Sequence, residues 1–170
     1  MSRAFVNWSF VALVIMPIGA AAPRQDPAPA AKVILRVRGE VPRELGLTAS
    51  DFTRLPRQTI RAKDHEGKEA DFAGVPLVEV LKAAGLKFGQ DLRGPALATY
   101  LVVEASDGYR AVFALPELDP AFTDRVILLC DQRDGKALSE REGPLRLVVP
   151  GEKRHARWVR QVVALKIGRG

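Results

Sequence analysis

Cysteine is almost absent from the sequence, since Cys130 is the only one among 170 residues. A single cysteine excludes an internal disulfide and any metal centre built from several thiolates. Cys130 ends an apolar run, residues 126–130, that is typical of a buried strand. We therefore expect a buried, inert thiol, because a reactive cysteine needs solvent access and a lowered pKa.

Aromatic residues are also scarce, at 6% of the chain, and neither a recognition helix nor an RNA-binding sheet motif is present. The chain is moderately basic, with 26 Lys and Arg against 20 Asp and Glu and a formal net charge of +6 at pH 7. Nucleic-acid binding needs a reading element or stacking surfaces in addition to charge. The sequence therefore predicts no nucleic-acid partner.

The apolar run at residues 10–18 is too short for a comfortable membrane span, which takes about 20 residues in a helix. It follows Arg3 and precedes small residues at 19–22, the pattern of a cleaved secretory signal. We assign residues 1–22 to a signal peptide, 23–31 to a disordered leader rich in Pro and Ala, and 32–168 to one folded domain. The mature protein is expected in the periplasm or outside the cell, with no membrane span.

The rest of the chain alternates short strands with a few short helices. Strands are predicted at residues 33–37, 58–63, 97–104, 109–115, 126–130, 145–149 and 162–167, with another ending at Phe72. A capping-box pattern at 48–51 predicts a helix over 52–55, and apolar positions 77, 80, 81 and 84 predict a second helix that starts at Pro76 and stops at Gly85. Residues 116–122 are expected to form a helical turn, and 131–142 a polar loop. This pattern predicts an α+β domain with mainly antiparallel pairing.

The segment at residues 143–162 joins the most apolar late strand to the densest positive charge. Leu145, Leu147 and Val149 alternate along this strand, which predicts one buried face before a stop at residues 150–151. Five basic residues follow, which are Lys153, Arg154, His155, Arg157 and Arg160. A loop of this kind, held to the body by Trp158, is suited to an anion site, because guanidinium groups chelate phosphate or carboxylate oxygens. A solubilising surface loop remains the alternative.

For three other polar residues a structural role also competes with a functional one. His65 lies between Asp64 and Glu66, so it is either a ligand or general base, or part of a solvated turn. Asp107 and Tyr109 flank a glycine, and we expect them to fix a hairpin instead of binding a ligand.

Several motifs resemble the sulfite oxidase-type, or oxidoreductase molybdopterin-binding, domain family. They are Phe-Ala-Gly-Val-Pro-Leu at 72–77, Ser-Asp-Gly-Tyr at 106–109, Asp-Gly-Lys-Ala-Leu at 134–138 and Gly-Pro-Leu-Arg-Leu-Val-Val-Pro-Gly at 143–151. The resemblance covers residues 33–167 and implies an α+β fold that holds a molybdenum pterin, molybdopterin, in a basic cleft. It assigns Arg146 to the pterin phosphate and Arg157 to a position that usually carries a cofactor-binding lysine. With Lys153 and His155, these form the predicted cofactor-binding set.

The sequence departs from the family pattern in two places. The cysteine that binds molybdenum in the family would fall at residues 62–64, where none is present. The twin-arginine signal that such enzymes use is also missing, since Ala4 follows Arg3. Two hypotheses remain: an exported, non-catalytic binding module for a small anion or pterin-type ligand, and an oxidoreductase that holds the molybdenum pterin without a protein thiolate. The expected partners are a small anionic ligand and a redox or membrane protein.

Overall fold

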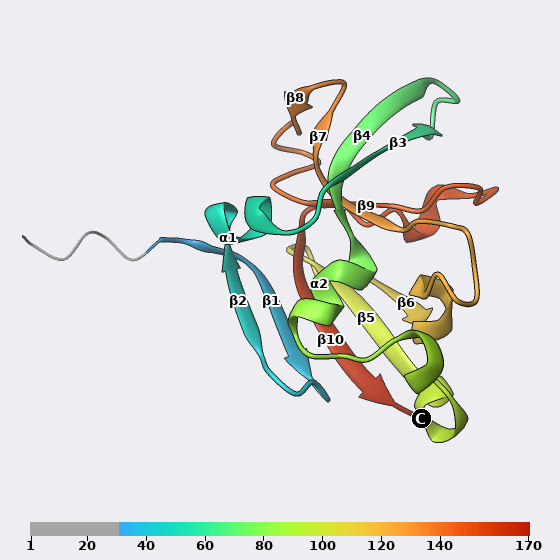
Figure 1. Ribbon diagram of the computed structural model, residues 1–170. Helices are drawn as coiled ribbons and strands as arrows, with labels where there is room; N and C mark the ends of the chain where they lie inside the picture. The colour runs from blue at the N-terminus through green and yellow to red at the C-terminus, as the bar shows by residue number, and fades with distance from the viewer. Residues whose placement is uncertain (1–30) are drawn as a thin grey trace, which may run out of the picture. The chain divides into compact units, whose positions relative to one another are not determined.

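The computed structural model describes residues 31–170. The predicted signal peptide and nearly all of the predicted leader lie outside the described residues, so both assignments stay predictions. Within residues 31–170 no helix is long and apolar enough to cross a membrane. The described chain is built on two five-stranded sheets and a few short helices (Figure 1).

The first sheet has the strand order β2-β1-β10-β5-β6. Its strands are β1 (Val33–Gly39), β2 (Leu45–Thr48), β5 (Thr99–Ala105), β6 (Arg110–Ala114) and β10 (Val162–Arg169). The first and last strands of the domain, β1 and β10, pair in parallel at its centre, and the other neighbours in this sheet are antiparallel. The last strand therefore carries the segment that precedes it, residues 150–161, to one end of this sheet.

The second sheet has the order β3-β4-β7-β8, and β9 pairs with β7 beside this path. Its strands are β3 (Gln58–Lys63), β4 (Glu69–Pro76), β7 (Leu128–Arg133), β8 (Lys136–Ala137) and β9 (Arg146–Val148). At Gly74, β4 passes so close to β7 that an added Cβ would lie 2.2 Å from the carbonyl oxygen of Leu129. Only glycine allows this approach, which lets β4 and β7 stay paired through an irregular step in register.

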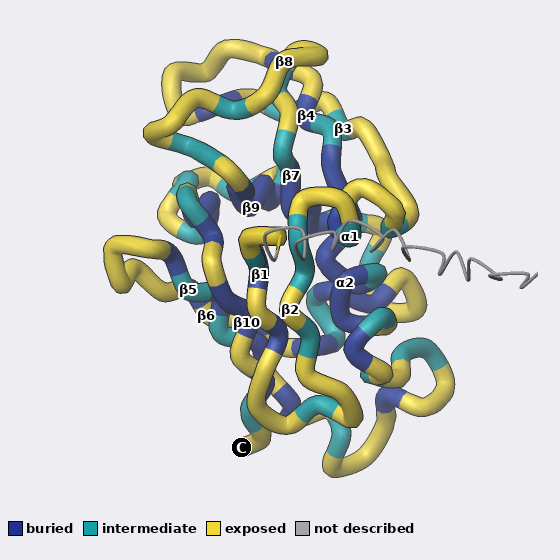
Figure 2. Tube along the Cα trace, turned by 90° about the vertical axis from the view of Figure 1, so that its left-hand side faces the viewer, coloured by how far each residue is buried: buried dark blue, intermediate teal, exposed yellow. Residues whose placement is uncertain are grey.

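Short helices connect the strands. They are α1 (Ala49–Arg54), α2 (Leu77–Ala83) and four 3₁₀ helices, η1 (Gly89–Asp91), η2 (Gly94–Ala98), η3 (Leu115–Leu118) and η4 (His155–Arg157). The capping box predicted for α1 is present, because the side chains of Thr48 and Asp51 each accept a hydrogen bond from the other residue's backbone. Helix α2 lies over the first sheet and buries Leu77, Val80 and Leu81 in a core to which both sheets contribute (Figures 1 and 2).

The predicted fold class is confirmed, and most predicted strands are present within a few residues of their expected bounds. The predicted polar loop at 131–142 is wrong in part, because β7 continues to Arg133 and β8 pairs with it across a turn. The prediction also missed β2, whose pairing with β1 is a long-range effect that its own four residues do not signal. Pro76 ends β4 and caps α2, where we expected it inside the first turn of the helix.

Candidate functional site

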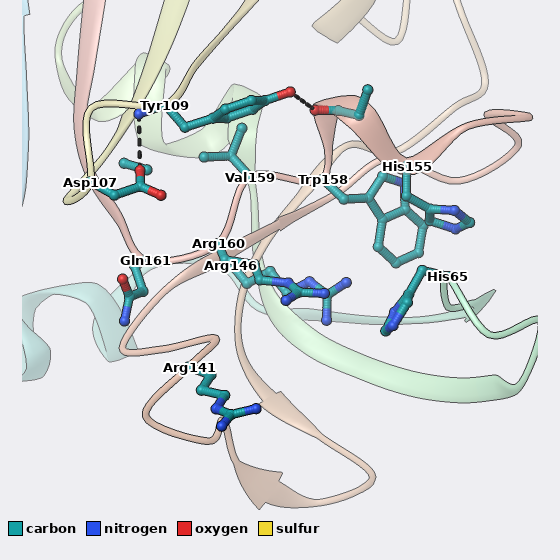
Figure 3. Close-up of a pocket in the computed structure, with 12 residues that line it drawn as sticks. His65, Asp107, Tyr109, Arg141, Arg146, His155, Trp158, Val159, Arg160 and Gln161 are labelled. Atoms are coloured by element: carbon teal, nitrogen blue, oxygen red, sulfur yellow. Dashed lines mark hydrogen bonds between the residues drawn. The ribbon is translucent and has the colours of Figure 1, made fainter.

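A cavity of about 450 Å³ opens at the end of the first sheet, where several loops meet (Figure 3). Its walls come from the β3–β4 turn, the β5–β6 hairpin, the loop before β9, β9 itself and the segment from η4 to β10. The lining residues are His65, Ala105, Asp107, Tyr109, Arg141, Arg146, His155, Ala156, Trp158, Val159, Arg160 and Gln161. Both histidines of the sequence thus line one cavity, together with three arginines.

Arg146 forms the inner wall of this cavity and is only 1% exposed. We predicted that it would be on the polar face of a half-buried strand, but every residue from 145 to 149 is buried, because the strand has covered residues on both faces. The guanidinium lies 5.7 Å from the ring centre of Phe72 and 5.3 Å from that of Trp158, and it forms an ion pair with Glu142. Burial lowers the pKa of Arg146, and the Glu142 carboxylate opposes that shift.

One nitrogen of Arg146 remains unsatisfied. Its Nε is buried and has no hydrogen-bond partner within residues 31–170. Buried N–H groups are almost always paired in folded proteins, so an unpaired one on a cation that lines a cavity is unusual.

The mouth of the cavity carries further positive charge. Arg141 and Arg160 are exposed, and neither has a carboxylate partner among the described residues. In Figure 3 the side chains of Arg146 and Arg160 extend in the same direction, toward His65, and Arg141 projects from the loop drawn below them. Asp107 is the only carboxylate among the lining residues, so the three guanidinium groups outnumber the carboxylates of the lining.

Trp158 lies in the wall between this cavity and a second cavity next to it. Its indole Nε1 donates to the carbonyl oxygen of Val149 at 2.9 Å, and its ring meets Phe72 edge to face at 5.7 Å. His155 packs on the same indole at 4.4 Å, and its Nε2 lies 2.9 Å from the carbonyl oxygen of Lys63. The predicted anchoring of the basic loop by Trp158 is confirmed.

The predicted cofactor-binding residues separate into two groups. Arg146 and His155 line the cavity described above, whereas Lys153 lines a neighbouring cavity of about 400 Å³ that also includes Lys63 and His155. Arg157 lines neither, because its side chain lies over Phe113 and is held by two glutamates.

The two partners of Arg157 explain its direction. Its Nε donates to Glu152 at 2.7 Å and its Nη1 to Glu117 at 3.1 Å. Glu152 precedes Arg157 by five residues in the same loop, whereas Glu117 comes from η3, which no local pattern places beside Arg157. A charged residue in a loop turns toward the carboxylates that tertiary packing supplies, so the adjacent Arg157 and Trp158 differ in role.

Asp107 and Tyr109 fix the hairpin as predicted, and both also line the cavity. The carboxylate Oδ1 of Asp107 accepts from the backbone N–H of Tyr109 at 2.9 Å, which fixes the β5–β6 turn. The phenol of Tyr109 then donates to the carbonyl oxygen of Ala156 at 2.6 Å, so the hairpin also supports η4.

Two further lining residues, Arg141 and Gln161, were not predicted from the sequence. Arg141 lies in the predicted polar loop, where no sequence motif marks it. Gln161 is distinguished by its positive φ, which only the structure shows.

The family model for the oxidoreductase molybdopterin binding domain matches residues 20–168, which is most of the chain. The chain belongs to this family. Among solved structures, the sulfane dehydrogenase SoxCD from Paracoccus pantotrophus superposes with a TM-score of 0.62 at 25% sequence identity. The match covers 78% of this chain but 37% of that chain, so this chain corresponds to little more than a third of its length. No curated protein matches the sequence.

Membership in the molybdopterin-binding family implies that a molybdenum cofactor is the group to test against this site. The positively charged wall fits the anionic part of such a cofactor, because Arg146 offers a buried donor without a partner. The sulfur chemistry fits less well. Cys130 is fully buried in β7, and burial raises the pKa of its thiol to about 12. The described residues also contain no cluster of three or more His, Cys, Asp or Glu side chains that could hold a metal ion.

Asp64 lies where the family's cysteine was expected, and its carboxylate has a structural role. It is buried and accepts hydrogen bonds from the backbone N–H groups of Glu66 and Lys68, each at 2.9 Å, and from Arg133 at 2.6 Å. Burial alone would raise the pKa of Asp64, but the bonds from Arg133 and the two amides hold that pKa at about 2. These contacts close the β3–β4 turn and leave the adjacent His65 at the cavity wall.

Proposed function

We propose that this member of the molybdopterin-binding family binds a small anionic ligand in the arginine-lined cavity, with Arg146 as the central donor. The observation that carries the proposal is the buried Nε of Arg146, which has no partner among the described residues. An unpaired buried donor of this kind costs about 1–3 kcal/mol, which a hydrogen bond to a ligand oxygen would recover. Phosphate, sulfate and carboxylate groups present such oxygens in the geometry that a guanidinium recognises.

Arg141 and Arg160 support the proposal because they add positive charge at the mouth and are not neutralised by carboxylates of residues 31–170. His65 and His155 supply imidazole nitrogens along the same wall. The neighbouring Trp158 limits the space on the inner side, so a ligand would contact both a charged and an aromatic surface. The cavity volume of about 450 Å³ is within the range of small-molecule sites.

A molybdopterin-type ligand fits this proposal through its phosphate, which Arg146, Arg141 and Arg160 would hold. When bound, such a cofactor supplies two-electron redox chemistry at molybdenum. Because Cys130 is the only cysteine and is buried in β7, we propose that the chain offers no thiolate to the metal and acts as a non-catalytic binding module. An oxidoreductase that binds the molybdenum pterin through the pterin's own sulfurs is the second candidate, which family membership favours.

We further propose that the protein is exported, on the basis of the signal-like pattern at residues 1–22. A redox or membrane protein partner would then be met outside the cytoplasm. The likeness to sulfane dehydrogenase SoxCD supports a redox partner for the second candidate.

Isothermal titration with inorganic phosphate tests the anion site. Binding is expected for the wild type, and the double variant R141A/R160A should lose at least about tenfold in affinity, because it removes two charges at the mouth. The R146K variant keeps the charge but removes Nε, so it should also bind about tenfold more weakly. The matched control is R36A/R93A, which removes two exposed arginines away from the cavity. Equal affinity in all four proteins would remove the cavity from the proposal.

Molybdenum and pterin content distinguishes the two candidates. The protein would be purified from a host that makes the cofactor, analysed for metal, and oxidised for pterin fluorescence. A binding module is expected to carry no stoichiometric molybdenum. About one molybdenum and one pterin per chain would favour the oxidoreductase and contradict the non-catalytic reading.

A further inference from the structure

Gln161 has a backbone conformation that few residues other than glycine adopt. Its φ is +48°, and within residues 31–170 only Asp134 shares a positive φ among non-glycine residues. Asp134 stands before Gly135 in the tight turn between β7 and β8, where this conformation is common. Gln161 instead immediately precedes the long central strand β10 and lines the cavity. Long polar side chains rarely occupy this region without compensating contacts.

The compensating contacts of Gln161 are four hydrogen bonds to two other segments. Its backbone N–H donates to the carbonyl oxygen of Glu142 at 2.9 Å, and its carbonyl oxygen accepts from the backbone N–H of Ser106 at 3.0 Å. Its side chain repeats both connections. The amide Oε1 accepts from the hydroxyl of Ser106 at 2.9 Å, and Nε2 donates to the carbonyl oxygen of Glu140 at 2.8 Å. The β5–β6 hairpin and the loop before β9 are thus both tied to the segment that enters β10.

The two tied segments and the segment of Gln161 itself carry three charged groups of the cavity, those of Asp107, Arg141 and Arg160. Glu140 and Glu142 flank Arg141, and Glu142 forms the ion pair with Arg146. Arg160 is the direct neighbour of Gln161 in the chain. The side chain of Gln161 therefore sets how far the loop that carries Arg141 stands from the segment that carries Arg160.

We infer that Gln161 is a positioning residue of the anion cavity: its side-chain amide holds the Arg141–Glu142 loop and the β5–β6 hairpin at the spacing in which the arginines face a common ligand. The inference rests on the proposed function and assigns Gln161 no contact with the ligand. It predicts that the side chain matters for affinity more than for folding, because both backbone bonds can form with any residue other than proline at position 161.

Glycine at position 161 separates these two effects. Glycine adopts a positive φ without strain, so Q161G keeps the backbone bonds and relieves the conformation while it removes both side-chain bonds. Q161A removes the same bonds and keeps the strain. Phosphate titration of Q161G and Q161A should show a loss of about fivefold to tenfold in affinity for each, as expected when side-chain hydrogen bonds that fix a site are lost. The urea midpoint of Q161G should be equal to or above that of Q161A.

Two more variants sharpen the comparison. S106A removes only the hydroxyl that meets Oε1, so its loss in affinity should be smaller, about twofold to threefold. Q90A removes an exposed glutamine in η1, outside this cavity, and should bind phosphate like the wild type. Wild-type affinity in Q161G and Q161A, with a binding-competent wild type, would overturn the inference.

Hydrogen exchange gives a readout that does not need a ligand. In Q161G, the amides of residues 139–143 should exchange faster than in the wild type, whereas amides of β4 and β7 should not change. If the wild type itself fails to bind phosphate, the proposed function is lost, and exchange alone then decides the positioning role. Unchanged exchange at residues 139–143 would overturn it.

Discussion

Replacing Asp64 with asparagine should make the stability of the protein less dependent on acid pH. The pKa of Asp64 falls from an ordinary 3.8 to about 2 in the folded chain, because Arg133 and the amides of Glu66 and Lys68 outweigh the effect of burial. Each unit of pKa shift corresponds to about 1.4 kcal/mol, so the ionised carboxylate stabilises the fold by about 2 kcal/mol at neutral pH. Asparagine has a similar shape but carries no charge.

The sign follows from the direction of the shift. A carboxyl group whose pKa is lower in the folded than in the unfolded chain stabilises the folded state above the unfolded pKa, here 3.8. That contribution decreases as pH falls and is gone below the folded pKa of about 2. The free energy of unfolding of the wild type should therefore exceed that of D64N by about 2 kcal/mol at pH 7, with the difference shrinking between pH 4 and pH 2.

Urea unfolding followed by circular dichroism, at several values from pH 2 to pH 7, measures this difference directly. D91N serves as the control, because Asp91 is exposed in η1 and forms no ion pair with another described residue. A difference between wild type and D64N that stays constant over this range would refute the reasoning. It would show that the hydrogen-bonding shape of Asp64 matters and its charge does not.

Two further predictions concern residues whose position the structure explains. R157A should lower the free energy of unfolding by about 1–2 kcal/mol, because Arg157 loses Glu117, Glu152 and the ring of Phe113, yet phosphate affinity should stay within about twofold, since the side chain does not line the cavity. A large loss of phosphate affinity in R157A without a lower free energy of unfolding would indicate that Arg157 takes part in ligand binding. Cys130 should react with a thiol reagent at pH 8 at least about a hundredfold more slowly in native protein than in urea, because its pKa is about 12 and its side chain is buried. Equal rates in the two conditions would contradict its burial.

Local patterns in the sequence were sufficient for most of the fold. Alternation and turn residues located the two hairpins around residues 64–68 and 106–108, and the capping pattern located α1. The apolar run that ends at Cys130 correctly indicated a buried thiol. β2 and β8 were missed, because strands of four and two residues depend on their pairing partners and not on their own composition.

Local sequence patterns predicted only part of the candidate site. The sequence identified a basic segment and its anchor, Trp158, but it could not tell which cations face one another. Arg157 was expected in the site and turns to Glu117 and Glu152, whereas Arg141 was not expected and lines the cavity. Charge content is a property of the sequence, but the direction of a charged side chain depends on which partners the folded chain places around it, and Glu117 reaches Arg157 from a distant segment.

The sequence by itself determined the family, the α+β class and the position of Arg146 in a late apolar strand, because each depends on motifs or periodicities of neighbouring residues. Tertiary structure alone decided that Arg146 is buried with an unpaired Nε, that His65 and His155 share its cavity, and that Gln161 joins the surrounding loops. These facts arise where β10 pairs in parallel with β1 and draws the 150–161 segment against two hairpins. Contacts between segments so far apart in the chain are set by packing of the whole domain, which no local pattern encodes.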